Sequence, residues 1–142
     1  ESKLIPGTDG EKMSKSKNNV INICASEKEL KKQIQSIKTD STALEKPKVW
    51  KSCNLFKIYS LIASNKQIEA MKTNYQNGGY GYGHGKKDLV ELILNKYSKE
   101  RERYNYYISN PNEVEKILIQ GSLKAKATAD EVLNRVRKKL GY

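Results

Sequence analysis

Apolar residues beyond about residue 25 recur three and four positions apart, which is the spacing of a helix with one buried face. The first such face consists of Leu30, Ile34 and Ile37. It follows Ser26 and Glu29, which have the S-x-x-E spacing of a capping box at the start of a helix. The pattern therefore predicts a first helix from about residue 26 to residue 37.

Two further helices are predicted in the middle of the chain. The second helix ends near Ala63, and its apolar face consists of Leu55, Ile58, Tyr59 and Ile62. Ser64 and Gln67 form another capping box, which predicts a third helix as far as about Gln76.

The segment from residue 39 to residue 50 is predicted to be a connector, because polar residues and Pro47 interrupt the helical pattern. Asp40 in this segment has three possible roles: a turn cap, an RNA contact, or neither. The turn is favoured, since aspartate side chains commonly bond to their own backbone in turns.

Five glycines between residues 77 and 85 invite comparison with phosphate-binding loops. The comparison fails, because Tyr80 stands where a P-loop needs its first glycine and Lys87 stands where it needs Ser or Thr. A tight corner between helices is the better interpretation. Tyr80 and Tyr82 then either pack into the corner or stack on bases. His84 is the only histidine, and alone it is a weak candidate for metal binding or acid-base chemistry.

The last third of the chain is predicted to hold three helices. The longest runs from about Lys86 to Ile108, with a buried stripe of Leu89, Ile93, Tyr97, Tyr104 and Ile108. Asn110 and Pro111 begin a short helix that Gly121 ends. The final helix has an apolar face of Ala129, Val132, Leu133, Val136 and Leu140. No alternating strand pattern is present, so the predicted fold class is all-α, a helical bundle preceded by a flexible loop.

Composition narrows the classes of protein. The 142 residues match one compact unit, and 37% hydrophobic residues suffice for a modest core. No apolar run approaches the ~18 residues that span a bilayer, so no membrane partner is expected. Cys24 and Cys53 are too few for a zinc site, and no metal site is expected. A disulfide between them stays open, with reduced thiols favoured.

The formal net charge of +11 indicates a polyanionic partner. The residues from 46 to 72 contain a single acid, Glu69, against six lysines: Lys46, Lys48, Lys51, Lys57, Lys66 and Lys72. These lysines are the candidates for contact with an RNA backbone, and the alternative is an ordinary solvated helical face. Four basic residues near the end of the chain suit either RNA or the negative end of the last helix: Arg135, Arg137, Lys138 and Lys139.

The most specific pattern is the pentapeptide KMSKS, formed by Lys12, Met13, Ser14, Lys15 and Ser16. Two lysines three positions apart on a flexible loop can both reach one polyphosphate, and the serine hydroxyls can add hydrogen bonds. Gly7 and Gly10 allow the loop to hinge. The alternative is a disordered basic arm, since short motifs also occur by chance.

KMSKS resembles the second signature of class I aminoacyl-tRNA synthetases. The segments KNNVINI, SIKTDS, CNLFKIYSLIA, YQNGGYGYGHGKKDL and RERYNYYI follow it in an order similar to that of bacterial tryptophanyl-tRNA synthetases. The resemblance covers essentially the whole chain. The succession from Tyr75 to Lys86 favours the tryptophan enzyme over its tyrosine relative.

The resemblance implies a larger enzyme, a tryptophan-tRNA ligase, whose C-terminal part is this chain. Residues 1–25 would be the KMSKS loop and a linker from a nucleotide-binding catalytic domain, and residues 26–142 a helical domain that binds the tRNA anticodon. Lys12 and Lys15 would be catalytic, and the whole pentapeptide would bind ATP.

The implied partners are tRNA(Trp), tryptophan, and ATP with Mg²⁺ as a substrate. The enzyme would be cytoplasmic and a homodimer through the absent domain. Without that domain, which would carry the tryptophan pocket, the chain alone is expected to be inactive and to hold no cofactor. Two alternatives stay open: a non-catalytic helical RNA-binding or adaptor module, and a tyrosyl-tRNA synthetase fragment.

Overall fold

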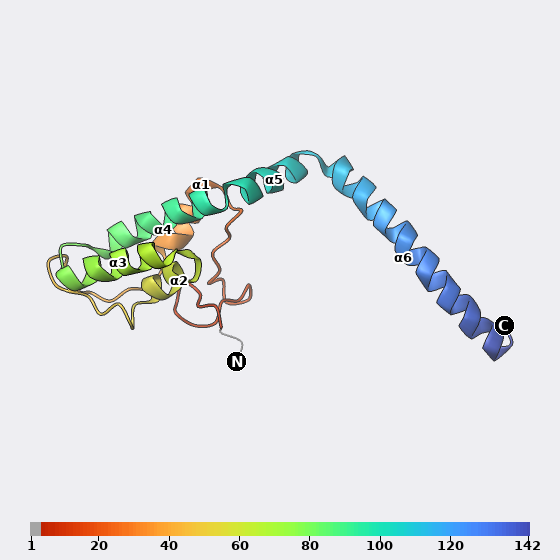
Figure 1. The fold of residues 1–142 in the computed structure, drawn as a ribbon, viewed down its shortest axis with the longest axis horizontal. Coiled ribbons are helices and arrows are strands. Elements are labelled where there is room, and N and C mark those ends of the chain that lie inside the picture. Colours follow the sequence, from red (N-terminus) through yellow and green to blue (C-terminus); the bar gives the residue numbers. More distant parts are fainter. Residues whose placement is uncertain (1–3) are drawn as a thin grey trace. The chain divides into compact units, whose positions relative to one another are not determined.

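The computed structural model describes residues 4–142, and the part it describes is all-α, as predicted. It contains the helices α1 (Glu27–Gln35), α2 (Asn54–Ile62), α3 (Asn65–Asn77), α4 (Tyr82–Lys96), α5 (Ser98–Ser109) and α6 (Pro111–Leu140) (Figure 1). In place of strands, these residues contain one isolated antiparallel bridge between Pro6 and Lys12. They divide into two compact units, one ending at Arg101 and the other running from Glu102 to Tyr142.

The helices α1 and α3 begin where their capping residues predict. Ser26 is the N-cap of α1 and accepts a hydrogen bond from the backbone N of Glu29. Ser64 and Gln67 make both bonds of a capping box at the start of α3. Because each cap satisfies backbone N–H groups that the helix leaves unpaired, a short sequence signal suffices to fix these starts.

The core of the first unit lies between α4 and the helices α1 and α2, and α3 packs against α2 (Figure 1). Its most deeply buried large side chains are Tyr75, Leu30, Ile34, Ile37, Leu55 and Leu89. Each aliphatic side chain of this kind contributes about 1.5–3 kcal/mol by leaving water. The ammonium group of Lys86 also donates a hydrogen bond of 2.7 Å to the carbonyl of Gln35, which joins α4 to the end of α1. This bundle is the support on which the N-terminal loop rests.

The glycine-rich corner is present but shorter than predicted. Gly78 and Gly79 both have φ of 75°, and the N–H of Gly79 donates to the carbonyl of Leu44. α4 begins at Tyr82, four residues before the predicted Lys86. Gly81 is therefore the N-cap of α4, and Gly83 and Gly85 lie inside the helix.

Tyr80 and Tyr82 pack into the corner, one of the two fates predicted for them. Their ring centroids lie 5.4 Å and 5.9 Å from that of Tyr75. The hydroxyl of Tyr80 donates to Asp88, and that of Tyr82 donates to Asp40 over 2.8 Å. Burial is the main cause that raises the pKa of both phenols well above the ordinary value. Asp40 also accepts from the backbone N of Thr42, so the turn role favoured for Asp40 is confirmed.

The predicted helix from residue 86 to residue 108 is in fact two helices, with a break at Tyr97. Leu89 and Ile93 are buried as predicted, but Tyr104 and Ile108 are 44% and 65% exposed. Apolar spacing shows which face of a helix is apolar, and it does not show whether another segment covers that face.

The two helices predicted around Gly121 are one helix of 30 residues, α6. Pro111 occupies its first turn as predicted, but Asn110 bonds back to the carbonyl of Tyr106 and does not cap it. Glycine in a helix interior costs about 0.5–1 kcal/mol. Alanine, leucine and lysine after Gly121 are strong helix formers, and together they outweigh that cost. None of the residues of α6 is buried, including its predicted apolar face. Neither α6 nor any other described helix is long and apolar enough to cross a membrane.

Candidate functional site

The KMSKS pentapeptide lies at the end of a compact backbone loop. The N–H of Gly7 donates to the carbonyl of Glu11 over 2.7 Å, and the N–H of Met13 donates to the carbonyl of Ile5 over 2.8 Å. Gly10 turns the chain between these bonds with φ of 89°, a conformation that favours glycine. The bonds place Lys12 beside Pro6 and give the loop a defined shape.

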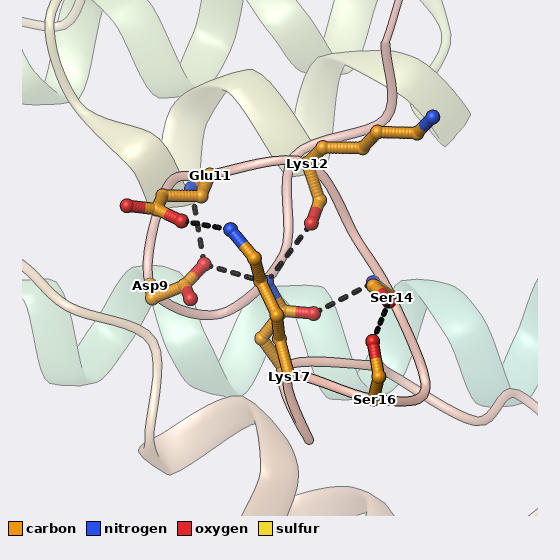
Figure 2. A network of polar contacts seen from close by, with 7 residues as sticks. Asp9, Glu11, Lys12, Ser14, Ser16 and Lys17 are labelled. Atoms are coloured by element: carbon orange, nitrogen blue, oxygen red, sulfur yellow. Dashed lines mark hydrogen bonds and ion pairs between the residues drawn. The ribbon is translucent and has the colours of Figure 1, made fainter.

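Asn19 holds this loop from inside. Its side-chain Nδ2 donates to Asp9 Oδ1 over 2.8 Å and to the carbonyl of Lys12 over 3.1 Å, while its Oδ1 accepts from the backbone N of Ser14 over 2.7 Å. Its own carbonyl accepts from the N–H of Thr8 over 2.9 Å. Figure 2 shows the three side-chain bonds, which run to Asp9, Lys12 and Ser14. Asn19 is 2% exposed, so the amide is removed from competing water.

Asp9 is a second fixed point of the loop. The same carboxylate oxygen accepts the bond from Asn19 and a bond of 3.0 Å from the backbone N of Glu11. The hydrogen bond from Asn19 is the main cause that lowers the pKa of the Asp9 carboxyl below its ordinary value. Asp9 is therefore an anion at neutral pH and accepts both bonds.

The lysines of the loop differ in their surroundings. Lys17 pairs with Glu11, whereas Lys12 and Lys15 are exposed and no carboxylate of residues 4–142 lies within 4.0 Å of either ammonium group. In Figure 2 the side chain of Lys12 extends away from the hydrogen-bond network. Ser14 and Ser16 share a hydroxyl hydrogen bond of 2.8 Å. The loop thus keeps two of its positive charges available for an anion from outside this part of the chain.

The loop is attached to the helical bundle through Asn54, the first residue of α2. Asn54 Nδ2 donates to the carbonyl of Gly7 over 2.9 Å, and the N–H of Lys38 donates to the carbonyl of Thr8 over 2.8 Å. Neither Asn54 nor Asn19 was predicted from the sequence as a site residue. Nothing in the sequence separates Asn19 from its exposed neighbour Asn18, because only the folded loop brings Asp9 and Ser14 to it.

The six candidate RNA-binding lysines differ in their exposure to solvent. Lys46, Lys51, Lys57 and Lys66 are exposed. Lys48 is 4% exposed, and its ammonium group donates to the carbonyls of Ala43, Leu44 and Lys46 over 3.1 to 3.2 Å. It closes the connector before α2, so we remove it from the proposed phosphate contacts.

Lys72 has an intermediate position. It lies 4.9 Å from the centroid of the Trp50 ring and forms an ion pair of 3.2 Å with Glu69. Lys51 lies 5.6 Å from the same ring. A half-buried indole with two lysine ammonium groups within 6 Å of its centroid is an arrangement that cation–π attraction stabilises.

The other titratable candidates form no cluster. His84 is exposed, and its Nδ1 accepts from the N–H of Gly81 over 3.2 Å. Residues 4–142 contain no group of three or more side chains suited to hold a metal ion. Cys24 and Cys53 are both free thiols, and burial raises the pKa of Cys53 above its ordinary value.

A family model described as "tRNA synthetases class I (W and Y)" matches residues 2–98. The chain belongs to this synthetase family. It is 47% identical over 138 residues to the tryptophan-tRNA ligase of Campylobacter jejuni (strain RM1221), covering 97% of this chain and 43% of that protein. It is 40% identical to the Fusobacterium nucleatum tryptophan-tRNA ligase, covering 99% of this chain and 43% of that protein. The resemblance to the tryptophan enzyme is thereby confirmed.

The fold of this synthetase segment is also found in a solved relative. The crystal structure of tryptophanyl-tRNA synthetase from Campylobacter jejuni, complexed with ADP and tryptophan, matches with a TM-score of 0.94 and 44% identity. The match covers 99% of this chain and 44% of that one. The segment therefore spans less than half the length of these relatives.

Proposed function

We propose that the chain is part of a tryptophan-tRNA ligase, in which it supplies the KMSKS loop and a helical tRNA-binding domain. The observation that carries the proposal is the pair of exposed ammonium groups on Lys12 and Lys15, which lie on a hydrogen-bonded loop without a carboxylate partner in the described residues. The match along nearly the whole chain to proteins named tryptophan-tRNA ligase supports the substrate assignment.

In the proposed reaction, the tryptophan carboxylate attacks the α-phosphate of ATP, and pyrophosphate leaves. Negative charge builds on the leaving group, so cations directed at it stabilise the transition state more than the ground state. Lys12 and Lys15 supply these cations, and the hydroxyls of Ser14 and Ser16 add hydrogen-bond donors. ATP enters with Mg²⁺ as a substrate. The tryptophanyl adenylate then transfers its amino acid to tRNA(Trp), and AMP leaves.

The proposed role of the helical bundle is to bind the anticodon end of the tRNA. Its support is the charge of the stretch from residue 46 to residue 72, in which the exposed lysines are Lys46, Lys51, Lys57 and Lys66. Lys72 adds a partly neutralised charge beside Trp50. A basic surface of this kind contacts phosphates and gives affinity that depends on salt.

Lys57→Gln and Lys66→Gln are each expected to weaken tRNA binding and to reduce the slope of log K against log salt by about 0.7 to 0.9. The reason is that each lost phosphate contact releases one counterion fewer. The measurement is a salt titration of tRNA affinity with the full-length protein. Lys28→Gln on α1 is the matched control, because Lys28 is exposed and lies outside the stretch. Unchanged slopes for both variants would remove this stretch from the interface.

The test of the proposed function is amino-acid-dependent exchange of pyrophosphate into ATP by the full-length protein, run in parallel with tryptophan and tyrosine. Exchange with tryptophan alone is the expected result. Exchange with tyrosine alone would select the tyrosine enzyme. No exchange with either amino acid would favour the helical RNA-binding or adaptor module.

A further inference from the structure

We propose that Asn19 is a positioning residue, which sets the direction in which the KMSKS loop presents Lys12 and Lys15. The inference rests on the proposed function, because it assumes that the two ammonium groups act on the ATP phosphates. Asn19 lies outside the pentapeptide and carries no charge, so its proposed effect on the reaction is exerted through those lysines alone.

The contacts of Asn19 lie on both sides of Met13. Its Nδ2 holds the carbonyl of Lys12 over 3.1 Å, and its Oδ1 holds the backbone N of Ser14 over 2.7 Å. Two bonds from one rigid amide fix the orientation of the peptide groups between them. They therefore fix the direction in which the Lys12 side chain leaves the backbone.

The constraint continues to Lys15. Ser14, held by Asn19, shares a hydroxyl bond of 2.8 Å with Ser16, and the carbonyl of Lys15 accepts from the N–H of Asn18 over 3.1 Å. Lys15 thus lies in a turn that two bonds hold: the bond between Ser14 and Ser16, and the bond from Asn18, the residue before Asn19.

The chemistry of the site requires an amide. The side chain must donate to Asp9 and Lys12 and accept from Ser14 at the same time, which a carboxylate or a hydrocarbon side chain does not do. Gly7 provides the space, because a Cβ at residue 7 would lie 2.4 Å from Asn19 Nδ2. A side chain at residue 7 would therefore displace the amide of Asn19.

Positioning of this kind has a kinetic consequence. A displacement of about 1 Å in a catalytic group can cost ~10²-fold in rate. Loss of the Asn19 bonds is therefore expected to lower the rate of adenylate formation more than ATP binding in the ground state, because the charge that the lysines meet develops in the transition state.

The test variant is Asn19→Asp in the full-length protein, measured by tryptophan-dependent pyrophosphate exchange. A carboxylate still accepts from Ser14 but cannot donate, and it faces the Asp9 carboxylate at hydrogen-bond distance. We expect kcat to fall ~10- to 100-fold and KM for ATP to stay within about twofold. Asn22→Asp is the matched control: Asn22 is exposed, and its side-chain Oδ1 accepts from the N–H of Cys24, which aspartate does equally well.

The double variant Asp9→Asn with Asn19→Asp exchanges the two groups and restores a donor facing an acceptor. It is expected to recover part of the lost kcat, because two carboxylates no longer face each other while the bond to the carbonyl of Lys12 is still missing. It is also the deciding variant if Asn19→Asp alone fails to fold. Full recovery of kcat by the double variant, which lacks the bond to the carbonyl of Lys12, would overturn the proposal.

A double-mutant cycle separates positioning from general stability. In a Lys12→Ala background, Asn19→Asp is expected to lower kcat at least about threefold less than in the native protein. The reason is that the Lys12 ammonium group, which Asn19 positions, is already absent. Full additivity, or no effect of Asn19→Asp in the native protein, would overturn the positioning role of Asn19 but not the proposed function of the loop. If Lys12→Ala and Lys15→Ala each left exchange unchanged, the proposed function of the loop itself would fail.

Discussion

Lys15→Ala in the full-length protein is expected to lower the rate of tryptophan-dependent pyrophosphate exchange by ~10²- to 10³-fold, the usual cost of removing one donor that meets developing charge. The side chain is exposed and has no carboxylate partner within the described chain, so the change removes no ion pair from the folded protein. The loss should fall on kcat more than on KM for ATP, because the charge on pyrophosphate develops in the transition state.

Lys17→Ala is the control for Lys15→Ala. It removes the same charge two residues away, but Lys17 is paired with Glu11 and is therefore not free to meet a phosphate. Exposed ion pairs contribute little to stability, so this variant is expected to fold and to exchange at close to the native rate. Equal losses for the two variants would mean that the loop acts through its overall charge. An unchanged rate for Lys15→Ala would remove Lys15 from the mechanism.

Gly78→Ala is expected to produce the largest loss of stability among the glycine variants, at least about 2 kcal/mol. Gly78 has φ of 75° and ψ of 178°, a backbone conformation that is almost restricted to glycine. A Cβ at this position would lie 2.3 Å from the carbonyl oxygen of Glu45, a backbone atom that cannot turn aside. Urea denaturation followed by circular dichroism measures the change in the free energy of unfolding.

Two neighbouring glycines separate the causes. Gly79 has the same φ of 75°, but no atom lies within 4 Å of a Cβ built there, so Gly79→Ala measures backbone strain without the collision. Gly83 lies in α4 and is equally open, so Gly83→Ala is expected to stabilise the helix by about 0.5–1 kcal/mol. If Gly78→Ala cost no more than Gly79→Ala, the contact with Glu45 would not constrain the corner.

The sequence predicted the elements whose signals are local. Ser26 and Ser64 fix the starts of α1 and α3 through bonds to residues three positions away, so a short stretch of chain contains the whole interaction. The same kind of reasoning misplaced the start of α4, because Gly83 and Gly85 suggest a loop. At Gly85 the missing side chain serves packing instead, since a Cβ there would lie 2.7 Å from the hydroxyl of Tyr75.

At Gly121 a local signal was given too much weight, and a helix end was predicted where the helix continues. A helix-breaking preference of this size is small compared with the summed preference of the residues around it, and α6 continues through it. The exposed positions Tyr104 and Ile108 were misjudged for another reason. Burial depends on what lies against a face, which periodicity does not contain.

The sequence by itself determined the all-α class, three helix starts, the KMSKS pentapeptide and the synthetase family, because caps, periodicity and motifs are properties of neighbouring residues. Only the tertiary structure decided which lysines are available. It pairs Lys17 with Glu11 and buries Lys48 among three carbonyls, while Lys12 and Lys15 stay exposed. It also gave Asn19 its place, since a hydrogen bond between residues ten positions apart exists only when the folded loop brings its two groups within 3 Å and shields them from water.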